Sequence, residues 1–185
     1  MRTFIAVEPP DVLRAAFGDF CNAISGYFPG LRWTNPKNIH LTLRFLGEID
    51  PADLGTLKDA VENSAAGIAP FELALSKAGF FGSKRNPRVI WLGLEEQPLL
   101  KNLARDLEDS LQQAGFGRAD KPFRGHLTLA RIKRPLREPP DWEAINRQLP
   151  AAWPEWRVAQ VHLIKSTLTP SGPIYEILKS CSLNG

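Results

Sequence analysis

The tetrapeptide HLTL at residues 40–43 returns at residues 126–129, and this repeat decides the predicted fold. Side chains alternate between the two faces of a β-strand. In each copy the two leucines therefore share one face, and the histidine and threonine share the other. In the first copy the same alternation places Arg44 on the polar face and Phe45 on the apolar face. The chain has three histidines, and the repeat contains two of them.

The segments around each copy predict similar units of strands and helices. Apolar residues recur at helical spacing before each copy, and alternating or β-branched runs indicate strands. We predict strands at 2–8, 39–46, 71–80, 88–94, around 126–129, at 157–168 and at 174–180, helices at 10–28, 50–67, 97–114 and 142–149, and a turn at 169–172. These elements predict one α+β domain spanning residues 1–185. We expect a bilobal architecture of two pseudo-symmetric halves, each with an antiparallel sheet and flanking helices, and a cleft between the sheets.

Composition places the chain among folded proteins that are not embedded in membranes. Of its 185 residues 43% are hydrophobic, and no apolar run approaches the roughly 20 residues that span a bilayer. The N-terminal segment is too short and too soon interrupted by Glu8 to be a secretory signal. Cys21 and Cys181 form no metal or redox motif, so we expect a cytoplasmic protein with free thiols. The net charge of +3 is compatible with a phosphate-bearing ligand.

Two histidines and two threonines on facing strands suit acid–base chemistry on a phosphodiester. With an ordinary pKa near 6.5, one imidazole can be neutral while the other is protonated. The neutral imidazole takes a proton from a nucleophile, and the charged one gives a proton to a leaving group. The threonine hydroxyls can donate hydrogen bonds to the charged oxygens between them.

Other kinds of site fit the sequence less well. A zinc site needs three or four ligands, and each HLTL copy offers one histidine, with His162 as the only further imidazole. No signature of a serine or cysteine nucleophile occurs, and no phosphate-binding glycine loop occurs. We therefore expect neither a metal nor a cofactor.

The chain resembles the two-histidine phosphoesterase superfamily, which two H-x-T-x motifs define. The segments "MRTFIAVEPP", "RWTNPKNIHLTLRFLGE", "SKRNPRVIWLGL", "PFRGHLTLAR" and "STLTPSGPIYEIL" look like the bacterial and archaeal RNA 2′,3′-cyclic phosphodiesterases, long called 2′-5′ RNA ligases. The resemblance spans nearly the whole chain, in order. It implies hydrolysis of a ribose 2′,3′-cyclic phosphate to a 2′-phosphomonoester without a metal. The ligase activity would be the reverse reaction, with a 5′-hydroxyl in place of water and no need for ATP.

The resemblance also implies a role for each matching residue. His40 would be the general acid that protonates the 3′ leaving oxygen, and His126 the general base that activates water. Thr42 and Thr128 would hold the phosphate oxygens. Arg131 matches a position that assists the phosphate, although strict alternation from His126 places it on the opposite face. Arg131 reaches the site only if the strand ends, bulges or twists near Ala130.

Two alternatives to an enzyme acting on RNA ends stay open. The first is a related phosphodiesterase for small cyclic nucleotides or ADP-ribose cyclic phosphate. The second is a non-catalytic RNA-binding module, which would not require two titratable groups facing each other. We expect a monomer. Trp33, Phe81 and Tyr175 are candidates to stack on a base of the substrate, with a position in the core as the alternative for each.

Overall fold

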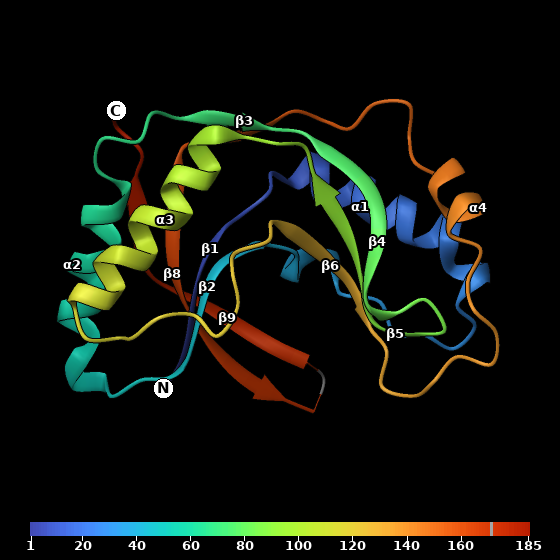
Figure 1. The fold of residues 1–185 in the computed structure, drawn as a ribbon, viewed down its shortest axis with the longest axis horizontal. Coiled ribbons are helices and arrows are strands. Elements are labelled where there is room, and N and C mark those ends of the chain that lie inside the picture. The colour runs from blue at the N-terminus through green and yellow to red at the C-terminus, as the bar shows by residue number, and fades with distance from the viewer. Residues whose placement is uncertain (171) are drawn as a thin grey trace.

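The computed structural model describes residues 1–170 and 172–185, and antiparallel strands form its framework (Figure 1). The predicted turn at 169–172 includes Ser171, which lies outside the described residues. The strands are β1 (Arg2–Val7), β2 (Leu41–Glu48), β3 (Phe71–Leu73), β4 (Leu75–Ser83), β5 (Asn86–Leu94), β6 (His126–Arg131), β7 (Trp156–Val158), β8 (Gln160–Thr169) and β9 (Gly172–Ser182). The α-helices are α1 (Asp11–Ile24), α2 (Leu54–Ala65), α3 (Pro98–Gln113) and α4 (Trp142–Arg147), and three short 3₁₀ helices span Ser25–Tyr27, Pro36–Asn38 and Pro51–Asp53.

The helices form where apolar residues recur at helical spacing. Leu100, Leu103, Leu107 and Leu111 of α3 are buried along one stripe. The helix ends because Gly115 has a φ of 88°, and Phe116 N donates to Leu111 O across the last turn. Within the described ranges, no helix is both long enough and apolar enough to cross a bilayer.

One seven-stranded sheet joins the two halves of the chain. Its strand order is β4-β5-β6-β2-β1-β8-β9, every pairing is antiparallel, and β3 and β7 form a separate two-stranded sheet. Within the described residues, β2 and β6 pair at a single position in the middle of this sheet, Leu41 opposite Leu127. Further along β6, Trp33 forms an isolated antiparallel bridge with Ala130. The predicted α+β class with antiparallel sheets is confirmed.

Each lobe contains segments from both halves of the chain. The first lobe consists of β2, β1, β8 and β9 with α2 and α3, which contact each other and these strands. The second lobe consists of β6, β5 and β4 with α1 and α4, on the other side of Figure 1. The helix that follows β1 therefore packs in the second lobe, and the helix that follows β5 packs in the first. The sequence did not predict this exchange.

Both repeat strands contain a β-bulge directly after the threonine. The register of β1 with β2 passes from Thr42 to Arg44, and that of β5 with β6 passes from Thr128 to Ala130. A bulge inserts one residue and reverses the alternation that follows it. The prediction that Arg44 lies on the polar face with the histidine is therefore wrong. Arg44 is buried on the other face, where it lies 3.6 Å from Glu108 of α3.

Truncating one leucine of the Leu41–Leu127 pair should lower the stability of the fold strongly. Leu127 is fully buried, so Leu127→Ala removes apolar burial and leaves a cavity at the joint between the lobes. We expect the free energy of unfolding to fall by about 2–5 kcal/mol in urea denaturation. Leu168→Ala is the control, because Leu168 is 67% exposed and should change stability little. Equal effects of the two substitutions would contradict the placement of Leu127 at the core of the joint.

Candidate active site

The two HLTL copies lie antiparallel to each other, and Leu41 of the first copy pairs with Leu127 of the second where the lobes join. Because β2 and β6 run antiparallel with Leu41 opposite Leu127, their register sets His40 beside Thr128 and Thr42 beside His126. The leucines are buried, and the histidines and threonines are partly exposed on the other face, which we call the motif face. Diagonal neighbours in a regular antiparallel pair have Cβ atoms roughly 7 Å apart. The pair therefore places the four predicted residues on one face around the joint, while a cleft between the lobes and contact of both histidines with one phosphate stay predictions.

Both histidines are oriented by the same backbone contact. Nδ1 of His40 lies 2.9 Å from the carbonyl oxygen of Asn38, and Nδ1 of His126 lies 2.7 Å from that of Arg124. A carbonyl oxygen can only accept, so Nδ1 carries the hydrogen in both rings. Nε2 is then the nitrogen available for chemistry, as an acceptor when the ring is neutral and as a donor when it is protonated. The two histidine rings are thus oriented by equivalent hydrogen bonds, each to the carbonyl oxygen two residues earlier.

Burial against aromatic rings and nearby cations lower the pKa of both histidines. The His40 ring stacks 4.6 Å from Phe4 and meets the edge of Tyr175 at 5.3 Å, and the His126 ring lies 4.9 Å from Phe81. Desolvation is the largest cause of the lowered pKa in each ring, and the Nδ1 hydrogen bonds oppose it. The lowered pKa values favour the neutral form of each imidazole.

The bulge in β6 brings Arg131 onto the motif face. After the bulge Ala130 is buried opposite Ile90, so Arg131, opposite Val89, returns to the face of Thr128. The positive charge of Arg131 lowers the pKa of both His40 and His126, which a cation near only one of them would not do. The sequence allowed Arg131 into the site only if the strand ended, bulged or twisted near Ala130, and β6 does bulge there. Its role toward a phosphate stays a prediction.

A partly buried arginine supports the loop before His40, and no sequence pattern indicated this contact. Arg14 of α1 is 13% exposed, and its Nη1 lies 3.2, 3.0 and 2.8 Å from the carbonyl oxygens of Pro36, Lys37 and Ile39. These carbonyls flank that of Asn38, which accepts from His40. Arg14 lay within a predicted amphipathic helix, where an arginine ordinarily indicates only a solvated position.

The third histidine lies outside both repeats and lines a surface hollow. His162 pairs in register with Ala6, and its Nδ1 lies 2.9 Å from Ser180 Oγ. One hollow of about 390 Å³ is lined in part by Glu8 and His162. Within the described part of the chain, no group of three or more histidine, cysteine or acidic side chains is placed to hold a metal ion.

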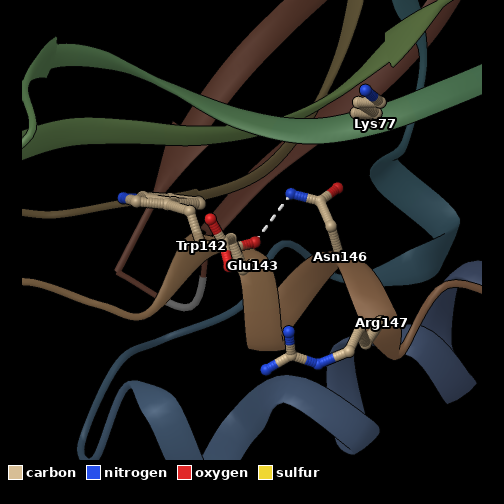
Figure 2. A pocket seen from close by; sticks show the side chains of 5 residues that line it. All are labelled: Lys77, Trp142, Glu143, Asn146 and Arg147. Carbon is tan, nitrogen blue, oxygen red and sulfur yellow. Dashed lines mark hydrogen bonds between the residues drawn. The ribbon is translucent and has the colours of Figure 1, made fainter.

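Figure 2 shows a second hollow, of about 450 Å³, between β4 and α4. Its lining residues are Lys77, Trp142, Glu143, Asn146 and Arg147. The side chain of Asn146 connects α4 with β4. Its Nδ2 donates to the carbonyl oxygens of Trp142 and Ala78, and its Oδ1 accepts from Ala78 N. These contacts attach α4 to the edge strand β4. We assign this hollow to packing of the second lobe.

Comparisons with known proteins agree with the repeat. The family model described as LigT like Phosphoesterase matches the chain twice, at residues 7–91 and 92–175. Each match contains one HLTL copy at nearly the same distance from its start. The internal repeat is therefore a repeat of the family unit.

Similar proteins match over their full length. An RNA 2′,3′-cyclic phosphodiesterase from Archaeoglobus fulgidus is 34% identical over 179 residues, covering 97% of this chain and 98% of its own. One from Thermotoga maritima is 32% identical over 185 residues, covering 100% of this chain and 97% of its own. Among solved structures, TT0787 of Thermus thermophilus is 34% identical with a TM-score of 0.82, covering 100% of this chain and 99% of its own.

The shared position of Arg131 predicts how the histidines titrate. Arg131→Gln removes a cation that lowers the pKa of both rings, so both pKa values should rise. Arg124→Gln should raise the pKa of His126 alone, because the Arg124 charge acts only on that ring. Titration of the histidine ring protons by NMR measures both effects. A response of only one histidine to Arg131→Gln would show that Arg131 does not lie between them.

Proposed function

Because the chain belongs to the LigT-like phosphoesterase family, we propose that it hydrolyses the 2′,3′-cyclic phosphate at RNA ends to a 2′-phosphomonoester. The phosphoesterase activity follows from the family. One observation supports the proposed mechanism most strongly: the interlocked register of β2 and β6, with both Nδ1 atoms bound to backbone carbonyls. This arrangement leaves two Nε2 atoms to act on one phosphate.

The proposed reaction uses the two histidines on opposite sides of phosphorus. Nε2 of His126 accepts a proton from water as the water oxygen bonds to phosphorus. The bond from phosphorus to the 3′ oxygen breaks, and Nε2 of protonated His40 donates its proton to that oxygen. His126 ends protonated and His40 neutral, so proton exchange with solvent resets the pair. The phosphate stays on the 2′ oxygen.

Thr42, Thr128 and Arg131 would stabilise the charge on the phosphate oxygens. Each threonine lies beside a histidine in the register, and Arg131 shares their face. Hydroxyl donors and a guanidinium aimed at developing charge are effective where water is partly excluded. The proposed mechanism needs no metal, and ligation would be its reversal with a 5′-hydroxyl as nucleophile. A monomeric state and a cytoplasmic location stay predictions.

A cationic surface favours RNA over a small cyclic nucleotide as the substrate. The end of the β4–β5 hairpin and the segment after β6 contact each other, since Ile132 N donates to Arg88 O. Their exposed cations form what we call the basic edge: Lys84, Arg85, Arg88, Lys133, Arg134 and Arg137. None of the six has a carboxylate partner among the described residues, whereas Lys101, Arg105 and Lys179 on the helical side each do. Unpaired cations beside Arg131 suit a chain of phosphates.

The proposed reaction is tested with a 2′,3′-cyclic mononucleotide in the presence of EDTA. We expect turnover to persist under chelation, and His40→Ala and His126→Ala each to lose about 10²–10⁴ in rate. The dependence of rate on pH should be bell-shaped, and replacing either histidine should remove one limb. His162→Ala is the control, because its ring contacts Ser180 and lies outside both repeats. Loss of turnover in EDTA with recovery by zinc or manganese would contradict the metal-free mechanism. Binding of RNA with no turnover would favour the non-catalytic alternative.

The basic edge is tested by comparing an RNA oligomer with the mononucleotide. The triple variant is Lys84→Gln/Arg85→Gln/Arg88→Gln. For a single-stranded oligomer, its slope of log KM against log salt concentration should be smaller by about two, since each phosphate contact contributes roughly 0.7 to this slope. KM for the mononucleotide should stay the same. Lys58→Gln/Lys101→Gln/Arg105→Gln removes the same charge from α2 and α3 and is the matched control. Equal changes for both substrates would favour a small cyclic nucleotide as the natural substrate.

A further inference from the structure

The two halves of the site differ at one position beside the histidines. Val7 pairs with Leu41 in the first half as Leu92 pairs with Leu127 in the second. The residues that follow Val7 and Leu92 are therefore equivalent. They are Glu8, directly after β1, and Gly93, within β5. Gly93 is in register with His126. A carboxylate thus stands beside one histidine, and a residue without a side chain stands beside the other.

In the second half a side chain at this position would be crowded by three neighbouring groups. A Cβ on Gly93 would lie 2.8 Å from Ser76 Oγ, 3.2 Å from the Trp91 ring and 3.3 Å from Lys77 O. The backbone oxygen of Lys77 cannot move without disturbing β4, and the indole is held by Arg124 and Phe81. The difference between Glu8 and Gly93 is therefore built into the packing of the second lobe.

The first half holds Glu8 in a fixed place. Its backbone oxygen accepts from Nε1 of buried Trp156 at 3.2 Å. One carboxylate oxygen, Oε1, lies 3.4 Å from Nη2 of Arg14. The same guanidinium binds three carbonyls that flank Asn38, whose own carbonyl accepts from His40 Nδ1. Glu8 and Arg14 therefore meet behind His40, from the end of β1 and from α1.

We propose that Glu8 and Arg14 are paired positioning residues that make His40, and not His126, the proton donor of the site. This inference rests on the proposed function. Arg14 fixes the loop that orients the His40 ring, and Glu8 supplies a negative charge that stabilises the imidazolium form of His40. His126 has an equivalent ring contact without either residue. The pair breaks the functional symmetry of two otherwise equivalent histidines.

The charges that face each ring agree with this assignment. Around His40, Glu8 raises the pKa, while Arg14 and Arg131 lower it. Around His126, Arg131 and Arg124 both lower the pKa, and no carboxylate among the described residues raises it. Tyr175, whose own pKa is raised by burial, meets His40 with its ring. Glu8 also raises the pKa of His162, so the titration of His162 is an internal reporter of the Glu8 charge.

The first test is removal of the Glu8 charge by the nearly isosteric Glu8→Gln. We expect the pKa of His40 to fall, since the carboxylate of Glu8 is a neighbouring opposite charge that favours the imidazolium form. The pKa of His162 should fall as well, and that of His126 should stay the same. Because the general acid must be protonated, the basic limb of the pH–rate profile should move to lower pH.

The second test separates the charge of Arg14 from its geometry. Arg14→Lys keeps the charge but cannot bind three carbonyls, so kcat should fall about 10- to 100-fold with the basic limb unmoved. Arg14→Gln also removes the cation, so the pKa of His40 and the basic limb should move upward, opposite to the effect of Glu8→Gln. A purely structural role would lower the melting temperature without moving the limb in opposite directions.

Matched controls and a separate readout complete the experiment. Glu96→Gln and Arg105→Lys alter exposed ion pairs on the first lobe and should change neither histidine. NMR titration of the free protein needs no turnover, so it tests the inference even if cyclic phosphates are not hydrolysed, an outcome that would overturn the proposed function alone. An unchanged pKa of His40 in Glu8→Gln, or an equal fall at His126, would overturn the inference.

Discussion

The backbone pairing of Leu41 with Leu127 is the contact on which the rest of the molecule depends. It is the one described pair between β2 and β6, and it joins the strands of the two lobes into one sheet. Both leucines are fully buried, so the joint is held by the same core that stabilises each lobe. Because the pair lies at the centre of both motifs, it also sets the spacing of the four polar side chains. Stability and proposed chemistry therefore share one location.

Near-symmetry around this pair makes the departures from it informative. The two bulges put Phe45 and Arg131 at equivalent positions, five residues after the motif histidines. Arg131 carries the charge that we propose for the phosphate, whereas Phe45 is half exposed under the guanidinium of Arg2 at 4.7 Å. A symmetric site binds a symmetric group well, but a reaction needs a donor on one side and an acceptor on the other. The differences between the repeats supply that direction.

Much of the fold could be predicted because its signals are local. The repeated HLTL, the helical spacing of the leucines in α3 and the proline after Asp50 each specify an element within a few residues. The bulges could not be predicted, because Leu43 and Leu129 look like ordinary strand residues and only their partners show the inserted position. Alternation therefore misplaced Arg44 and left Arg131 doubtful. Glu8 and Arg14 were also missed, since their importance arises from contacts with a loop that lies far along the chain.

The exchange of helices between lobes has a consequence for synthesis on the ribosome. The second lobe consists of α1, β4, β5, β6 and α4, so all of its elements have been made once residue 147 has emerged. The first lobe needs β8, which lies between β1 and β9 in the sheet, and both β8 and β9 come from the C-terminal end of the chain. Contacts between distant segments form slowly because the intervening chain must close a loop. During translation β1 therefore has one edge unpaired until β8 emerges. A nascent chain whose residues up to 147 have emerged, but not β8 and β9, has all elements of the second lobe and an incomplete first lobe.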